Sequence, residues 1–370
     1  MRAGDGRRES RMDRREEARP AQAGARVDVK KEVAQMLLEA MQAGDTPWQK
    51  PWSATAMRPT NLATANGYRG INRCLLGLAG GAIASRTGIA DGRWATYRQA
   101  AAHGWQVRKG ERGTGIVKVV ELGADREVQN AEGSRGARGE SGEERSDRSR
   151  FVLRRYVVFN AQQMDGVPEM EVASGQAFDP MDRAAAVIEA LKAKTGLIVV
   201  HGGNDACYVP SLDEVRLPHR RSFRDERSYR LCALHEAGHS TLSPKRLDRR
   251  EALGQKWGDE AYAMEELRAE LCSVFCHAEL AVGSGASGRS SSDMFSMGDA
   301  HIANHAAYLK HWLHAIRADP MAIFTAAKDA ELMADYMLGI EREFSAMARH
   351  EQWIAEYESV ESERKAERDR

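Results

Sequence analysis

The sequence predicts an α+β protein, with an N-terminal α/β domain over residues 27–170 and a mainly helical domain over residues 175–345. The length of 370 residues is enough for about two domains. Segments rich in β-branched residues lie between 106 and 160, which favours a sheet in the first domain. From Asp225 onward, apolar residues recur with helical spacing almost throughout, which favours helices in the second domain.

The first domain is expected to combine short helices with a β-hairpin. Residues 1–26 lack apolar periodicity and are predicted to form a disordered basic tail. Helices are expected from Val27 up to Gly44, over 70–79 and over 96–103. Strands are expected within 106–122 and over 151–160. The charged, glycine- and serine-rich segment 123–150 is expected to be a flexible insertion between these strands.

The composition changes after Pro168, which places the domain boundary near 170–180. A helix over 181–194, a strand over 197–200 and a hairpin over 207–218 are expected next. The helical remainder is interrupted by a glycine- and serine-rich loop over 282–292, and residues 346–370 are expected to form a charged C-terminal helix or tail.

The composition limits where the protein can act. Five scattered cysteines exclude a disulfide framework and are typical of a reducing compartment. No apolar run approaches the roughly 18 residues of a membrane span, and the start of the chain has no apolar stretch of signal-peptide type. A soluble, cytoplasmic protein without a membrane partner is therefore expected.

The charges are unevenly distributed along the chain. The 54 basic and 54 acidic residues cancel overall, but the segment from Lys50 to Lys118 holds eleven basic residues and only two acids, Asp91 and Glu111. The segment therefore carries a net charge of +9, and the remainder is acidic. A basic module of this kind indicates nucleic acid as the first candidate partner.

Aromatic residues are interleaved with these cations. Four of the seven tryptophans lie in this basic segment or just before it, at positions 48, 52, 94 and 105. Bases stack on aromatic planes while cations follow the phosphates, so the combination is typical of single-strand binding. The alternative is that the tryptophans are core residues and the arginines a solvated surface. The residues expected to contact DNA are Trp48, Lys50, Trp52, Tyr68, Arg69, Asn72, Arg93, Trp94, Tyr97, Arg108 and Lys109.

The sequence His235-Glu236-Ala237-Gly238-His239 predicts a metal site on a helix. Histidines four residues apart lie on one helical face, so both imidazoles can reach one Zn²⁺. Glu236, beside the first histidine, is positioned to take a proton from water at the metal. The alternative is a helix with incidental histidines.

A third ligand is expected on the next helix. Glu266 and Glu270 are also four residues apart, so one can bind the metal while the other holds a ligand histidine in its tautomer. Glu266 is the preferred ligand and Glu270 the supporting residue. The alternative is a solvated acidic face, which Glu265 alone would satisfy.

Together these motifs resemble the ArdC-type antirestriction proteins of conjugative plasmids, from about Val27 to Leu338. The resemblance rests on Pro47–Trp52, Tyr68–Asn72, Arg93–Tyr97, Val107–Glu111, Val158–Gln163, His235–His239 with Arg246-Leu247, Glu265–Glu270, His305–Tyr308 and Trp312. It implies an N-terminal single-stranded-DNA-binding domain and a C-terminal zincin-like metallopeptidase domain. It also implies zinc, or another divalent metal, bound by His235, His239 and Glu266, with Glu236 as general base. The insertion 123–150 and the sequence Gly238–Thr241 depart from the family pattern.

The expected function is therefore antirestriction: the protein would bind single-stranded plasmid DNA entering a cell by conjugation and protect it from restriction. Double-stranded DNA and a protein substrate or restriction–modification component are further candidate partners. One alternative is a metalloprotease that DNA localises near its protein target. Another is an accessory protein of a primase or transfer complex, in which the metal domain is only a scaffold.

Overall fold

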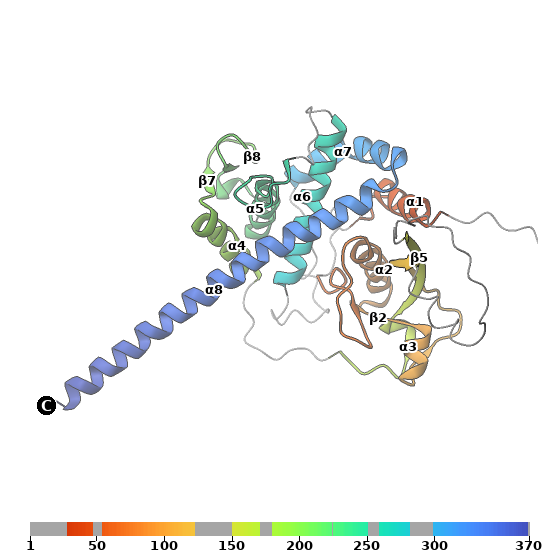
Figure 1. Cartoon of the computed structure of the whole chain (residues 1–370), viewed down its shortest axis with the longest axis horizontal. Coiled ribbons are helices and arrows are strands. Elements are labelled where there is room, and N and C mark those ends of the chain that lie inside the picture. Colours follow the sequence, from red (N-terminus) through yellow and green to blue (C-terminus); the bar gives the residue numbers. More distant parts are fainter. Residues whose placement is uncertain are drawn as a thin grey trace, which may run out of the picture.

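The computed structural model describes residues 28–46, 54–122, 150–170, 180–223, 225–250, 259–281 and 299–368. It has the predicted α+β fold (Figure 1). The tail 1–26, residues 123–149 of the expected insertion, and the loop 282–292 lie outside the described residues. We refer to residues 28–170 as the N-terminal half and to residues 180–368 as the C-terminal half.

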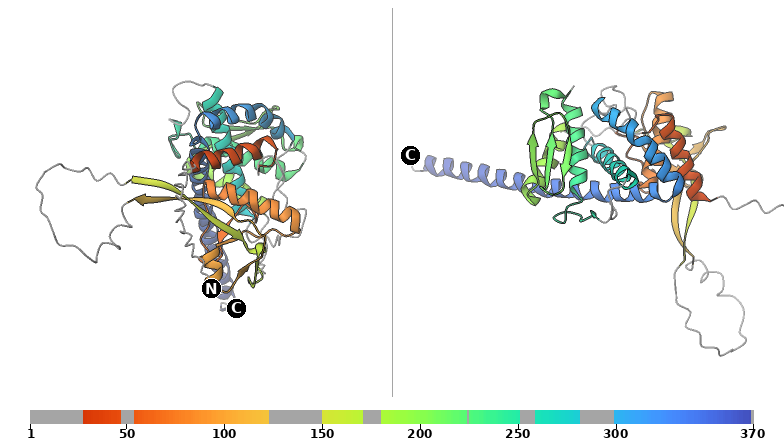
Figure 2. Two further views of the ribbon diagram at one scale, coloured as in Figure 1. Left: turned by 90° about the vertical axis from the view of Figure 1, so that its right-hand side faces the viewer. Right: turned by 90° about the horizontal axis from the view of Figure 1, so that it is seen from above.

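The N-terminal half is built on a four-stranded sheet in the order β1-β2-β5-β4. Strands β2, β5 and β4 pair antiparallel, whereas the short β1 pairs parallel to β2. Strands β4 and β5 stay paired from Thr114–Val158 to Leu122–Arg150, and this hairpin extends away from the body (Figure 2). The elements are α1 (Val29–Gln42), β1 (Thr60–Asn61), α2 (Ile71–Thr87), β2 (Arg93–Thr96), α3 (Tyr97–Ala102), β3 (Gln106–Val107), β4 (Thr114–Leu122), β5 (Arg150–Asn160) and β6 (Met164–Asp165).

Helix α2 is longer than the segment 70–79 predicted from the sequence. It continues through Gly80 to Thr87 and is capped by Gly88, whose φ of +73° is the left-handed conformation common after a helix C-terminus. Gly80 faces the sheet, where a Cβ would lie at an ordinary contact distance of 3.5 Å from the Trp94 ring. Tertiary packing thus outweighs the weak helix propensity of glycine.

The C-terminal half is mainly helical, with a small three-stranded sheet in the order β7-β9-β8. Helix α6 packs against α4, α5, α7 and α8. Helix α8 runs without a break across residue 345, where a boundary was predicted, and its C-terminal part projects from the body (Figure 1). The elements are α4 (Pro180–Thr195), β7 (Ile198–His201), β8 (Cys207–Val209), β9 (Glu214–Leu217), α5 (Glu226–Ser240), α6 (Asp259–Leu280), α7 (Asp299–Ala318) and α8 (Ala322–Arg368).

The two halves share one hydrophobic core. Leu37 and Met41 of α1 belong to the same cluster of buried residues as Leu234 of α5 and Phe275 of α6. Helix α1 also packs against α7. Segments on either side of the expected boundary are therefore held together by apolar burial, the main favourable contribution to folding.

Ion pairs also join the halves and account for part of the uneven charge. The buried Arg73 guanidinium contacts Glu331 at 3.0 Å and Glu279 at 3.1 Å. Arg58 contacts Glu279 at 2.9 Å, and Arg69 pairs with Asp335. These cations of the N-terminal half are thus partnered by acids of α6 and α8, so they are not simply a surface for an external polyanion.

None of the helices that the structure describes has the length and hydropathy of a membrane span.

Candidate metal centre and nucleic-acid surface

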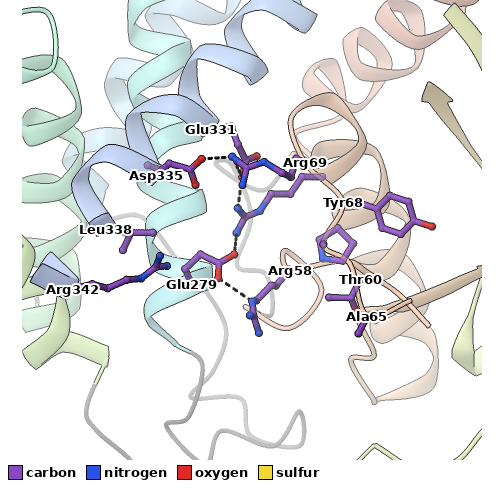
Figure 3. A pocket seen from close by; sticks show the side chains of 14 residues that line it. Arg58, Thr60, Ala65, Tyr68, Arg69, Glu279, Glu331, Asp335, Leu338 and Arg342 are labelled. Atoms are coloured by element: carbon purple, nitrogen blue, oxygen red, sulfur yellow. Dashed lines mark hydrogen bonds and ion pairs between the residues drawn. The ribbon is translucent and has the colours of Figure 1, made fainter. Parts of the chain in front are cut away.

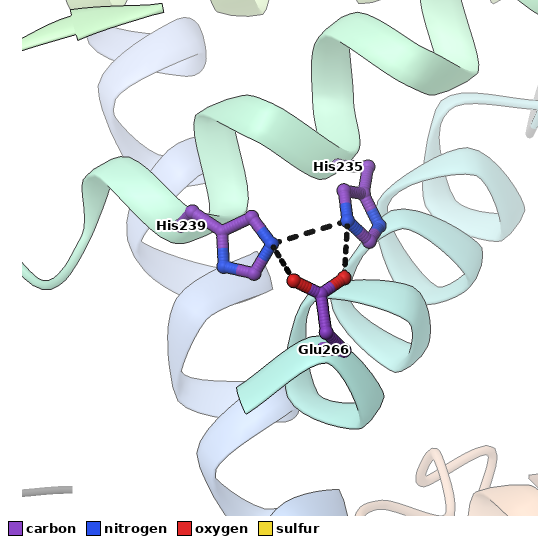
Figure 4. A group of neighbouring side chains, drawn as sticks. All are labelled: His235, His239 and Glu266. Atoms are coloured by element: carbon purple, nitrogen blue, oxygen red, sulfur yellow. Dashed lines mark hydrogen bonds and ion pairs between the residues drawn. The ribbon is translucent and has the colours of Figure 1, made fainter. Parts of the chain in front are cut away.

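Helices α5 and α6 bring His235, His239 and Glu266 together (Figure 4). Helix α5 begins at the N-cap Asp225, whose carboxylate accepts a hydrogen bond from the Ser228 backbone, and the two histidines share one face of its last turns. Glu266 reaches them from α6. All three residues are buried, with between 2% and 9% of their surface exposed.

The distances among these side chains suit one divalent cation. The Nε2 atoms of His235 and His239 lie 3.1 Å apart, and the Glu266 oxygens lie 3.4 Å and 3.5 Å from them. Two atoms held about 2.1 Å from one ion at a tetrahedral angle are about 3.4 Å apart. Two imidazoles and one carboxylate also form a set of protein ligands found in zinc enzymes. The residues present therefore fit a metal.

The second nitrogen of each histidine faces another carboxylate of α6. Glu270 Oε1 lies 3.6 Å from His235 Nδ1, the place expected from the sequence. Glu265 Oε1 lies 3.4 Å from His239 Nδ1. Carboxylates in such positions fix the orientation and tautomer of a ligand histidine.

The alternative of a solvated acidic face does not hold for Glu265. It is 1% exposed, and both of its oxygens accept hydrogen bonds from Arg249, at 2.8 Å and 3.1 Å. Arg249 also donates to Thr241 Oγ1 at 3.0 Å. Adjacent glutamates on a helix that faces inward point about 100° apart, so each can serve a different histidine. The pair Glu265-Glu266 was the signal that could have revealed this arrangement.

The buried carboxylates favour positive charge between the imidazoles. Burial lowers the pKa of His239, but Glu266 and Glu265 raise it more, to about 9. Burial likewise lowers the pKa of His235, while Glu270 and Glu266 hold it well above its ordinary value. Burial raises the pKa of Glu266, yet the two histidines bring it far below its usual range. A divalent cation would supply the same positive charge when it replaces these protons.

Two further residues complete the surroundings of the histidines. Glu236 on α5 is 5% exposed. The pKa of the Cys207 thiol on β8 is raised, first by partial burial of the thiol and then by the negative charge of Glu236. Strand β8 is an edge of the small sheet. Gly238 lies between the histidines, where an added Cβ would lie 3.4 Å from Met333 Cε of α8. The metal motif is therefore packed directly against α8.

Several residues expected to bind DNA have structural roles instead. The prediction for Trp94 is wrong, because its side chain is fully buried with Leu76 and Val158 and cannot stack on a base. The Asn72 amide joins α2 to β4, donating to Val117 O at 2.8 Å and accepting from Val117 N at 2.9 Å. Arg93 is paired with Asp91 at 2.8 Å.

The remaining candidates differ in how available they are. Tyr68 is half-buried and its hydroxyl accepts from Asn61 at 3.0 Å. Arg108 is exposed but paired with Glu111 and Asp165, each at 3.3 Å. Tyr97 is 56% exposed, and Lys109 is exposed as well. Trp48, Lys50 and Trp52 lie outside the described residues.

The N-terminal half carries exposed cations in addition to these candidates. Arg98 follows Tyr97 on α3, and Lys118 lies on the β4–β5 hairpin. Within the segment from Lys50 to Lys118, five exposed cations make no ion pair with any residue that the structure describes: Arg86, Arg98, Lys109, Arg112 and Lys118. The N-terminal half therefore keeps exposed positive charge in addition to the arginines that pair with α6 and α8.

Comparison with known proteins identifies both halves. Residues 27–159 match the family of the N-terminal domain of anti-restriction factor ArdC, and residues 186–329 match a family of zincin-like metallopeptidases. The metal-free crystal structure of antirestriction protein ArdC from plasmid R388 has a TM-score of 0.62 and 31% identity, covering 86% of this chain and 99% of that one. The chain belongs to the ArdC antirestriction family.

Other ArdC relatives add a metal and a plasmid context. The Mn(II)-bound structure of the R388 ArdC protein has a TM-score of 0.59 and 29% identity, covering 85% of this chain and 98% of that one, in agreement with a divalent-metal site. The uncharacterized protein y4eC of Sinorhizobium fredii is 35% identical over 84% of this chain and 91% of its own length. Two Escherichia coli proteins named DNA primase TraC are 37% and 36% identical over 84% of this chain. The chain spans only 27% and 20% of their lengths.

Proposed function

We propose that the protein is a cytoplasmic antirestriction factor that binds single-stranded plasmid DNA during conjugation and protects it from restriction. The observation that carries this proposal is that one ArdC-family chain unites a buried metal-ligand set with exposed cations on its ArdC N-terminal half. Tyr97 would offer an exposed ring to a base, and neighbouring cations such as Arg98 and Lys109 would follow the phosphates.

In the metal centre, His235, His239 and Glu266 would bind zinc, or another divalent ion such as manganese. When bound, the ion would supply Lewis-acid chemistry that polarises a carbonyl group and activates water. Glu265 and Glu270 hold the two imidazoles in place. Glu236 would accept a proton from the attacking water and return it to the leaving amine of a cleaved peptide. The protein substrate would be a restriction–modification component or another target held near the DNA.

The decisive experiment is binding of labelled single- and double-stranded oligonucleotides to the full-length protein at several salt concentrations, beside metal analysis of the purified protein. We expect single-strand binding whose logarithmic affinity falls linearly with the logarithm of salt concentration. We also expect close to one divalent ion per chain. Absence of oligonucleotide binding at low salt by the folded protein would reject the DNA part of the proposal.

The similarity to the TraC primases over 84% of this chain supports a second candidate, an accessory role in a primase or transfer complex with the metal domain as a scaffold. Transfer of unmodified plasmid DNA into a restricting and a non-restricting host separates the two. Antirestriction predicts protection only in the restricting host, whereas a transfer role predicts a defect in both when the protein is deleted.

A further inference from the structure

A cavity of about 270 Å³ opens where the N-terminal half meets α6 and α8 (Figure 3). We call it the seam cavity. Its charged lining consists of Arg58, Arg69 and Arg73 from the N-terminal half, Glu279 of α6, and Glu331, Asp335 and Arg342 of α8. Arginines therefore outnumber carboxylates, and they come from both halves of the chain.

Arg73 forms the fixed floor of the seam cavity. Its side chain is 4% exposed and donates to two carbonyl oxygens, Met57 O at 2.8 Å and Phe275 O at 3.2 Å. It also holds Glu331 and Glu279. A buried guanidinium with this many partners cannot exchange them for a ligand without leaving buried charges unpaired.

Arg58 and Arg69 differ from the buried Arg73 because their guanidinium groups are exposed to solvent. Their side chains are 44% and 59% exposed, and Asp335, the partner of Arg69, is 51% exposed. Exposed ion pairs contribute little net stability. A stronger anion can therefore replace Asp335 on Arg69 and can contact the exposed part of Arg58 beside Glu279.

Arg342 is the cation of the seam cavity with no carboxylate of its own. It is exposed on α8, extends toward the cavity in Figure 3, and makes no ion pair with another residue that the structure describes. Three exposed guanidinium groups, of Arg58, Arg69 and Arg342, thus line a cavity large enough for a phosphate with its sugar.

We propose that the seam cavity binds a phosphate group of a nucleic-acid strand, so that α8 of the metallopeptidase-like half takes part in DNA binding. This proposal rests on the nucleic-acid binding proposed above. Guanidinium forks match phosphate oxygens in geometry and charge, and a phosphate carries its full charge at neutral pH. Asp335, the exposed carboxylate of the cavity, occupies Arg69 until the phosphate displaces it.

The test compares full-length Arg342→Gln with Arg349→Gln, which removes another exposed arginine of α8 that does not line the cavity. With a labelled single-stranded oligonucleotide, we expect Arg342→Gln to weaken binding about three- to tenfold at low salt and to reduce the salt slope by about 0.7. Arg349→Gln should match the wild type. Equal binding by both variants overturns this proposal while the proposed function stands, whereas absence of binding by the wild type rejects the proposed function itself.

A second experiment uses a variant that should bind the oligonucleotide more tightly. Asp335→Asn removes the carboxylate that competes for Arg69, so binding should tighten about two- to fivefold, because the phosphate no longer displaces a charge. Glu343→Gln, which changes the net charge equally on an exposed α8 residue outside the cavity, should tighten it less. Equal effects of the two variants contradict the proposal.

Inorganic phosphate, titrated separately by calorimetry, distinguishes the source of the anion. If Arg342→Gln abolishes binding of inorganic phosphate but leaves oligonucleotide binding unchanged, the seam cavity serves a free anion and the proposal is wrong.

Discussion

Arg249 and Glu265 form a buried ion pair with two hydrogen bonds, at 2.8 Å and 3.1 Å, directly behind the imidazole of His239. Glu265 thereby links a metal-ligand candidate to an arginine outside the motif. The carboxylate is held ionised, because Arg249 and His239 lower its pKa more than burial raises it.

Removing Arg249 should therefore destabilise the protein and weaken metal binding. Arg249→Gln leaves the Glu265 carboxylate buried with one partner fewer, at a cost of about 3–5 kcal/mol in the free energy of unfolding. Metal affinity should fall about 10- to 100-fold, because His239 loses its fixed orientation. Urea denaturation and competition with a metal-binding dye measure the two effects.

The neighbouring Arg250 is a matched control. Its ion pair with Asp248 is exposed, with side-chain exposures of 62% and 55%, so Arg250→Gln should cost at most about 1 kcal/mol. Equal destabilisation by the two variants would contradict a specific role for the Arg249–Glu265 pair.

The metal-free protein should lose stability as the pH rises from neutral to alkaline. The pKa of His239 is raised from 6.5 to about 9 in the folded state, so the proton is held more tightly there than in the unfolded chain. This contribution is fully present below about pH 6.5 and disappears as the pH rises through about 9. The midpoint of urea denaturation of chelator-treated protein, measured between pH 6 and 9.5, checks the direction.

At acidic pH, the Glu266 carboxylate should make the metal-free protein lose stability as the pH falls. Its pKa lies below the ordinary value of 4.5, so its contribution is present above about pH 4.5 and disappears as the pH falls. The metal-free protein should thus be most stable between about pH 4.5, set by Glu266, and about pH 6.5, set by His239.

A histidine must lose its proton to bind a metal, so metal affinity should rise with pH up to about 9. Affinity that does not change between pH 6 and 9 would count against the histidine ligands.

Glu236→Gln should separate the two proposed activities. The amide keeps the size of the side chain but cannot take up a proton, so peptide cleavage should fall by about 100-fold or more. Metal content and oligonucleotide affinity should stay at wild-type values, because Glu236 belongs to neither set of contacts. Survival of plasmid protection in this variant would show that antirestriction does not need the peptidase chemistry.

Trp94 and Tyr97 should respond differently to substitution. Trp94→Ala empties a fully buried site and should cost about 3–5 kcal/mol in the free energy of unfolding, whereas Trp94→Phe should fold and bind an oligonucleotide as the wild type does. Tyr97→Ala, at an exposed position, should leave stability nearly unchanged and weaken single-strand binding by about 1–3 kcal/mol. Loss of binding in Trp94→Phe with wild-type stability would restore Trp94 as a DNA contact.

Among the ion pairs that join the two halves, those of Arg73 should contribute most to stability. Arg73→Gln leaves Glu331, whose side chain is 8% exposed, without its main cation and should cost about 3–5 kcal/mol in the free energy of unfolding. Arg86→Gln removes an exposed cation of the same helix and should change stability by no more than about 0.5 kcal/mol. Similar values for the two variants would show that the ion pairs at the seam contribute little.

The parts of this architecture that could be predicted from the sequence depend on local spacing. Histidines four residues apart share a helical face in any fold, so His235 and His239 were expected to converge, and the structure brings Glu266 to them. Their role as metal ligands stays a prediction. The strand pair from 106–122 and 151–160 was likewise visible in runs of β-branched residues.

What could not be predicted depends on contacts between distant segments. The sequence around Trp94 does not reveal that its ring is covered by Leu76 and Val158. Nor does it reveal that Arg69 and Arg73 are partnered by acids more than 250 residues away. The basic segment therefore looked more available to DNA than it is, because a net charge counted along the chain ignores tertiary ion pairs.

The place of Gly238 beside Met333 of α8 connects the metal motif to the seam cavity. Met333, Asp335 and Arg342 lie on one uninterrupted helix, within about 14 Å along its axis. An alanine at position 238 would meet the flexible end of Met333 at an ordinary contact distance of 3.4 Å. Only a larger side chain there would press on α8, so bulky substitutions at position 238 should be the ones that disturb both the imidazoles and Arg342.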